Sequence, residues 1–128
     1  MTRTASGTFE VSLAPGLAEL DGAVGRFELT KRFHGDFDGT GTGVMLAAGD
    51  PQTGTAGYVA IEVVKGLLGD LEGGFALQQF GTMSGGRQTL HYEVVPGSGA
   101  GELTGISGIL NLTIEEDGTH HYLLEYDL

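Results

Sequence analysis

Turn signals recur about every ten residues along this chain, and they limit its fold more than any other feature of the sequence. Clusters such as Gly35-Asp36, Asp50-Pro51-Gln52-Thr53-Gly54 and Asp117-Gly118 separate segments in which apolar and polar residues alternate. Alternation with a period of two is typical of half-buried strands, and short strands at this spacing are typical of sandwiches and barrels. The sequence therefore predicts an all-β fold.

Eight segments have the character of strands. They are residues 6–13, 22–34, 37–48, 57–68, 74–83, 87–95, 106–115 and 119–128. Helical spacing of Val64, Leu67, Leu68 and Leu71 offers a competing interpretation. Four glycines, at positions 66, 69, 73 and 74, would each weaken such a helix by up to about 1 kcal/mol. We therefore predict an eight-stranded antiparallel up-and-down barrel, which leaves no free edges, with an open sandwich as the alternative.

Length and composition restrict the class of protein further. A chain of 128 residues predicts one domain, 1–128. It contains no cysteine, so disulfides, thiolate catalysis and cysteine-ligated metals are excluded. Acidic residues outnumber basic ones 17 to 6, and the net charge of −11 opposes binding to nucleic acid or anionic membranes. No apolar leader or transmembrane run is present, so we expect a soluble cytoplasmic protein.

The motifs that would indicate a cofactor or metal are incomplete. Gly39-Thr40-Gly41-Thr42-Gly43 resembles a phosphate loop in composition only, because no Gly-Lys-Ser/Thr follows. Asp36-Phe37-Asp38-Gly39 lacks the closing acid of a calcium loop. His120 and His121 are adjacent in a strand and point to opposite faces, so they cannot share a site. We expect no cofactor and no metal, with a histidine-only site as the remaining metal alternative.

The candidate functional site consists of polar residues on strand faces that we expect to point into the barrel. Lys31 shares the apolar face of its strand with Phe27, and a buried lysine requires a partner. Glu62 lies in the segment richest in β-branched residues, and a Lys31–Glu62 ion pair is the simplest arrangement. A structural ion pair surrounded by satisfied tyrosine hydroxyls is one interpretation, and a ligand cavity with a polar centre is the other. The glycines at 39, 41 and 43 favour the cavity, because they remove side chains from one face of a strand.

The direction of Glu62 is ambiguous from the pattern alone. Tyr58, Ala60, Glu62 and Val64 form one face of the segment, and Val59, Ile61, Val63 and Leu67 form the other. Taken alone, the purely apolar face has the composition of an interior.

Several runs match a known family over essentially the whole chain. They are Ala5-Ser6-Gly7-Thr8-Phe9-Glu10-Val11, Lys31-Arg32-Phe33-His34-Gly35-Asp36-Phe37-Asp38-Gly39, Gly57-Tyr58-Val59-Ala60-Ile61-Glu62, Gly74-Phe75-Ala76-Leu77-Gln78-Gln79, Gly81-Thr82-Met83, Gly99-Ala100-Gly101-Glu102-Leu103-Thr104-Gly105-Ile106-Ser107-Gly108, and His120 with Tyr122 and Tyr126. The chain resembles a family of short bacterial proteins of unknown function that adopt an allene oxide cyclase-like β-barrel.

The resemblance implies an eight-stranded barrel with a central cavity. Relatives commonly carry polar residues at the positions of Val63 and Lys65, which implies that this face is exterior and that Glu62 points inward. Gln79 departs from the family pattern, in which histidine is frequent, so an acid–base role at that position is in doubt. The family supplies no settled activity, and likeness to a cyclase is a likeness of fold. An outward stripe of Val59, Ile61, Val63 and Leu67 then predicts a homo-oligomer.

Three functions follow as hypotheses. The first is binding of a small apolar molecule in the barrel. The second is a cyclase- or isomerase-type enzyme in which Glu62 is the acid or base and Lys31 stabilises negative charge. The third is a structural or interaction module with a filled barrel. The predicted catalytic residues are Glu62 and Lys31, and the predicted ligand-binding residues are Tyr58, Gln79, Tyr92, Tyr122, Tyr126, Phe27 and Phe75.

Overall fold

A computed structural model describes residues 2–128 and shows an all-β protein. Its strands are β1 (Arg3–Pro15), β2 (Gly25–Gly35), β3 (Phe37–Asp50), β4 (Thr55–Leu68), β5 (Leu71–Ser84), β6 (Arg87–Val94), β7 (Ala100–Gly101), β8 (Ser107–Ile114) and β9 (His120–Asp127). Two 3-10 turns, η1 (Leu20–Gly22) and η2 (Pro51–Thr53), lie between strands. Within residues 2–128, no helix is long and apolar enough to cross a membrane.

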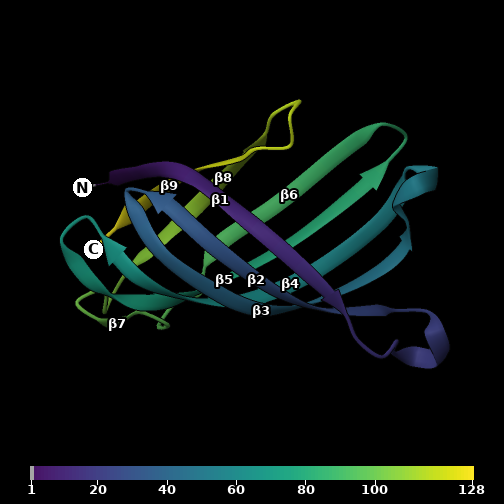
Figure 1. The fold of residues 1–128 in the computed structure, drawn as a ribbon, viewed down its shortest axis with the longest axis horizontal. Coiled ribbons are helices and arrows are strands. Elements are labelled where there is room, and N and C mark those ends of the chain that lie inside the picture. The colour runs from purple at the N-terminus through teal and green to yellow at the C-terminus, as the bar shows by residue number, and fades with distance from the viewer. Residues whose placement is uncertain (1) are drawn as a thin grey trace.

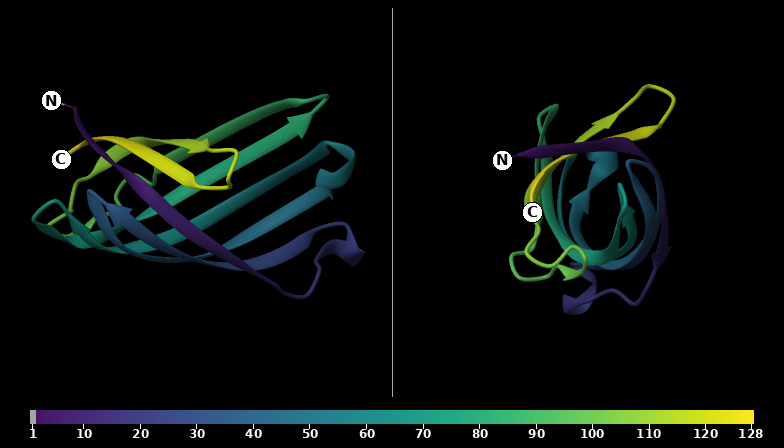
Figure 2. Two further views of the ribbon diagram at one scale, coloured as in Figure 1. Left: turned by 45° about the horizontal axis from the view of Figure 1, so that its top comes forward. Right: turned by 90° about the vertical axis from the view of Figure 1, so that its left-hand side faces the viewer.

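Antiparallel pairing closes the strands into a barrel (Figure 1). Each strand pairs with the next from β1 to β6, then β6 pairs with β8, β8 with β9, and β9 returns to β1. The predicted eight-stranded up-and-down barrel is confirmed, and the open sandwich and the helix over 64–71 are wrong. The end-on view in Figure 2 shows the strands arranged around a common axis.

The connection between β6 and β8 has more structure than the sequence indicated. β7 lies within it and pairs with Gly73 and Gly74 of β5. Leu103 and Ile106 then enter the core and are almost completely buried. This segment therefore closes one end of the barrel, although no strand was predicted between residues 95 and 106.

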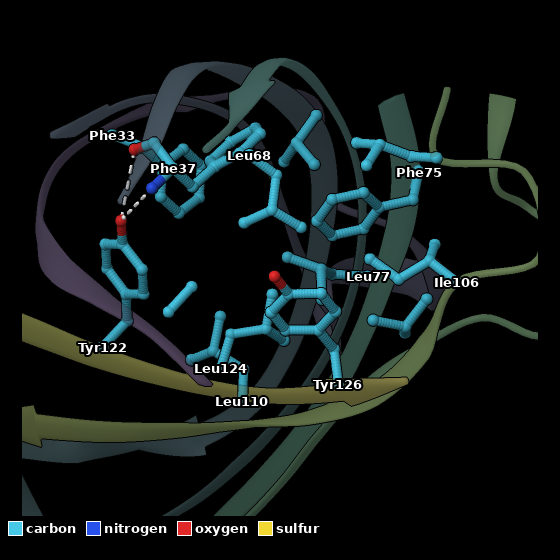
Figure 3. Packing of buried hydrophobic residues seen from close by; sticks show 14 of the residues in the cluster. Phe33, Phe37, Leu68, Phe75, Leu77, Ile106, Leu110, Tyr122, Leu124 and Tyr126 are labelled. Atoms are coloured by element: carbon cyan, nitrogen blue, oxygen red, sulfur yellow. Dashed lines mark hydrogen bonds between the residues drawn. The ribbon is translucent and has the colours of Figure 1, made fainter. Parts of the chain in front are cut away.

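Apolar side chains fill that end of the barrel. The cluster includes the aromatic rings of Phe33, Phe37, Phe75, Tyr122 and Tyr126, and Figure 3 shows them pointing inward from β2, β3, β5 and β9. Phe33 contacts both Phe37 and Tyr122 edge-on, with ring centroids 5.2 and 5.8 Å apart. Such edge-to-face pairs add to the stabilisation from apolar burial. This half of the barrel is a packed core.

The opposite half is open along one side because β8 and β9 are short. β6 pairs with β8 only at Glu93 and Ile109, and β1 pairs with β9 only from Arg3 to Phe9. The remainder of β6 and of β1 extends beyond β8 and β9, as Figure 1 shows. Inward positions of this half are half-buried or exposed, and they are largely apolar: Leu13, Phe27, Met45, Tyr58, Met83 and Leu90. The barrel is therefore closed by hydrogen bonds at one end and open at the other.

Candidate functional site

Glu62 points into the barrel from the middle of β4. Its side chain is 1% exposed, whereas its neighbour Ile61 is 57% exposed on the outer surface. The direction implied by the family resemblance is confirmed, and the direction favoured by hydrophobicity alone is wrong. The outer face of β4 carries exposed apolar side chains. The hydrophobic pattern alone therefore assigned this face to the interior.

Three polar side chains from three strands meet at Glu62. The Lys31 ammonium group on β2 donates to Glu62 Oε1 over 3.0 Å and to the Tyr92 hydroxyl on β6 over 2.7 Å. Tyr92 in turn donates a short hydrogen bond to the same Glu62 oxygen. We call Lys31, Glu62 and Tyr92 the polar triad. Lys31 is 7% exposed and Tyr92 3%, so the triad lies out of bulk water.

Burial and charge act on the triad in opposite directions. Burial lowers the pKa of Lys31, and the neighbouring Glu62 carboxylate partly offsets this by favouring the charged ammonium. The pKa of Tyr92 is raised well above its ordinary value, first by burial and then by the charge of Glu62. Tyr92 therefore stays protonated at neutral pH and acts as a donor to the carboxylate.

An aromatic ring completes the surroundings of Lys31. The ammonium nitrogen lies 4.4 Å from the centroid of the Phe9 ring on β1, within range of a cation–π interaction. Phe9 also contacts His120 on β9, with ring centroids 5.1 Å apart. Phe9 was not among the residues predicted for the site. The available signal was register, because Phe9 faces Phe33, two residues from Lys31.

A second polar pair lies beside the triad toward the open half. The Tyr58 hydroxyl on β4 donates to Gln79 Oε1 on β5 over 2.7 Å. Gln79 is the register partner of Tyr92, and the Glu62 charge contributes to raising the pKa of Tyr58 after burial, which contributes most. The structure therefore brings five of the predicted residues to one region of the barrel.

The other four predicted residues lie elsewhere. Tyr122 spans the barrel to the start of β3, where its hydroxyl accepts from Phe37 N at 3.0 Å and contacts Phe37 O at 3.1 Å (Figure 3). Tyr126 and Phe75 are part of the packed core. Phe27 is half-buried in the open half. Tyr122 thus holds the turn between β2 and β3 and is not part of the triad.

The glycines of β3 do not create empty space beside the triad. A Cβ atom at Gly41 would meet Val64 Cγ1 at 3.1 Å and Phe33 Cε1 at 3.4 Å. At Gly43 it would lie 2.8 Å from Glu62 Cα. The glycines allow β3 and β4 to approach closely, and neighbouring atoms occupy the volume that the sequence assigned to a cavity.

Two notches lie beside the triad at the open side. One lies between β6 and β8, has a volume of about 350 Å³ and is lined by Leu90, Tyr92, Leu110 and Leu112, among others. The other lies between β1 and β9 and is lined by Phe9 and His120, among others. Each notch therefore reaches a residue that contacts Lys31.

One atom of the triad is left without a hydrogen bond. Glu62 Oε2 is fully buried and has no partner among residues 2–128. Leaving a buried carboxylate oxygen unpaired costs about 1–3 kcal/mol or more. Native structures contain few such groups, so this oxygen calls for an explanation.

Comparison with known proteins agrees with the fold and supplies no activity. The crystal structure of a DUF3224 protein with unknown function from Shewanella oneidensis MR-1 is 43% identical, covers 100% of this chain and 98% of its own, and superimposes with a TM-score of 0.91. A search of curated proteins gave no match. The profile of the family described as "Protein of unknown function (DUF3224)" matches residues 5–126. The family resemblance is thus confirmed, and the protein belongs to the DUF3224 family.

Proposed function

We propose that this protein binds a small, mainly apolar molecule in the open half of its barrel. The ligand donates one hydrogen bond to Glu62 Oε2. The observation that carries this proposal is the unpaired, buried carboxylate oxygen. A bound hydroxyl would satisfy it, and the apolar lining of the open half would contact the rest of the molecule.

The geometry of the triad supports a donor as the ligand group. Glu62 Oε1 already accepts from Lys31 and Tyr92, so both strong donors nearby are engaged. Tyr92 lines the notch between β6 and β8, which has room for a molecule of two fused rings. The β6–β8 notch is therefore the entry route in this proposal.

A pair of matched probes tests the proposed hydrogen bond. 1-Naphthol has an apolar body and one hydroxyl donor, and 1-methoxynaphthalene has the same body without the donor. We expect the protein to prefer 1-naphthol by about tenfold or more, because a buried bond to a charged acceptor is worth about 1.5–3 kcal/mol. Fluorescence titration measures both affinities.

The E62Q variant identifies the acceptor. Glutamine keeps the shape of Glu62 and removes its charge, so the preference for 1-naphthol should fall to about threefold or less. The E116Q variant, in the exposed turn between β8 and β9, is the control and should keep the preference. Equal affinity for the two probes in the unmodified protein would contradict the proposal. Binding of neither probe would favour the filled-barrel structural module.

An enzyme of isomerase type is the second candidate, because the same oxygen is suited to proton transfer. Glu62 Oε2 accepts no hydrogen bond within residues 2–128, so in this mechanism it removes a proton from carbon once a substrate has displaced the atoms that cover it, and the ammonium group of Lys31 would stabilise the enolate that forms.

Deuterium exchange into 2-tetralone, an apolar ketone with an acidic carbon–hydrogen bond, separates binder from catalyst. If Glu62 transfers protons, NMR in D₂O should show incorporation at C1 faster than in buffer alone. This acceleration should be absent in E62Q and present in E116Q. Incorporation at the buffer rate in the unmodified protein would reject the enzyme and leave the binding proposal intact.

A further inference from the structure

The outer surface of β3, β4 and β5 is an exposed apolar band. Leu46, Val59 and Phe80 lie side by side in one row across the three strands, and Val44 and Ile61 lie side by side in the next. Val59 is 52% exposed and Ile61 57% exposed. A contiguous patch of this kind is unusual on a monomer and marks an interaction surface.

Charged or titratable residues lie at both ends of the two rows. The first row begins with Arg26 on β2 and ends with His91 on β6. The second row begins with Glu28 and continues through Gln78 to Glu93 on the same two strands. Along each flanking strand, therefore, a basic or titratable nitrogen lies two residues from a carboxylate.

This arrangement discriminates among the ways in which two copies could meet face to face. A two-fold axis parallel to the strands would place β2 of one copy over β6 of the other, with Glu28 against Glu93. An axis crossing the strands through either row would place Arg26 against Arg26 or Glu28 against Glu28. Like charges in contact cost several kcal/mol, so these packings are disfavoured.

We infer that two copies of this chain form a dimer whose two-fold axis crosses the strands between the two rows. Arg26 then faces the second copy's Glu28, and His91 faces its Glu93. Val59 faces Ile61, and Leu46 faces Val44. Each contact occurs twice, as an isologous interface requires. Among these face-to-face arrangements, this one alone places a carboxylate opposite Arg26 on one flank and opposite His91 on the other.

The size of the face is consistent with a dimer interface. Five strands spaced by about 4.8 Å span roughly 19 Å, and ten residues of β4 span roughly 33 Å. The planar area is about 600 Å², of the same order as the roughly 800 Å² that a stable interface buries on each partner. A hollow of about 480 Å³, lined by both rows, gives the apolar side chains of the second copy a place to enter.

A charge exchange between two variants tests the contact. R26E alone places a carboxylate at position 26 against Glu28 of the second copy, and E28R alone places a guanidinium group at position 28 against Arg26. We expect each to raise the dimer dissociation constant by about tenfold or more in sedimentation velocity. An equimolar mixture of the two variants should form dimers again. In a dimer that contains one copy of each variant, position 26 of either copy faces an opposite charge at position 28 of the other.

Mixing is informative because Arg26 and Glu28 also approach each other within one chain, at 3.8 Å. An effect transmitted only inside the chain would be the same in the mixture as in each variant alone. E116R is the control and should leave the dissociation constant unchanged. Thermal unfolding of each variant verifies that it is folded. A monomer in the unmodified protein, or a mixture that stays monomeric, would overturn the proposal.

Cysteine pairing tests the register independently, because the chain contains no cysteine of its own. Val59 lies opposite Ile61 of the second copy, whereas two Val59 side chains are displaced by about 6.6 Å along the strands. A mixture of V59C and I61C should therefore oxidise mainly to the mixed disulfide, identified by its mass. Homodimeric disulfides in equal or greater amount would reject this register.

Discussion

At the scale of single residues, the polar triad is a compromise between burial and charge. Removing two ions from water costs several kcal/mol each, and an ion pair recovers this only with good geometry and further hydrogen bonds. Tyr92 supplies such a bond to the carboxylate, and the Phe9 ring attracts the ammonium group. The unpaired Glu62 Oε2 is the remaining deficit. The ligand donor proposed above would satisfy this oxygen and offset the deficit.

Replacing Tyr92 with phenylalanine should change how stability depends on alkaline pH. The folded state holds the phenol proton because the pKa of Tyr92 is raised, whereas the unfolded chain releases it above about pH 10. The folded state then binds more protons, so the free energy of unfolding falls as pH rises. Y92F should make this fall shallower by up to about 1.4 kcal/mol per pH unit.

Urea unfolding between pH 9.5 and 11.5 measures this slope. Tyr58 and Tyr122, whose pKa values are also raised by burial, keep contributing in the variant, so the slope should decrease without vanishing. Identical slopes in the two proteins would show that the Tyr92 phenol loses its proton equally easily in the folded state.

At the scale of elements, β3 shows why three glycines share one face. Across the strand pair, Gly41 faces Val64 and Gly43 faces Glu62. Glycine brings the β3 backbone close to these partners, which bends the sheet around the triad and the neighbouring rings. The sequence indicated correctly that these glycines lie on one face of a strand. It did not indicate what occupies the space, because that depends on side chains from β2 and β4.

Alanine substitution separates a tight position in β3 from a looser one. At Gly43 the new Cβ would lie 2.8 Å from both Glu62 Cα and Cβ and closer still to the Ile61 carbonyl oxygen. At Gly41 its nearest neighbour is Val64 Cγ1, at 3.1 Å. We expect G43A to lower the free energy of unfolding by about 2–3 kcal/mol and G41A by about 1 kcal/mol or less.

Urea denaturation of the two variants measures the difference, with G41A as the matched control. Both substitutions add one methyl group to the same strand and face. If the two variants lose equal stability, close backbone approach at Gly43 is not the reason for its glycine.

At the scale of the whole molecule, local patterns predicted the barrel and tertiary context decided the site. The eight strands and their order followed from alternation and turn chemistry. The direction of Glu62 did not follow, because the exposed band of β4 is as apolar as a core face. The notches depend on how far β8 and β9 reach relative to β6 and β1, and strand ends are poorly defined by pattern. The burial of Leu103 and Ile106 was not predicted, because these residues lie within or next to a stretch rich in glycine.

The pairing of β1 with β9 also has a consequence for synthesis on the ribosome. Strands β2 to β6 can pair as consecutive hairpins while the chain emerges, because each strand pairs with the next one in the sequence. The outer edge of β1 remains unpaired until β9 has been synthesised, because its partner is the last strand of the barrel. Arg3 then pairs with Tyr126. Until then β1 presents an unpaired, aggregation-prone edge with Phe9 uncovered. A nascent chain of this topology therefore exposes this edge until β9 has been synthesised and has left the ribosome.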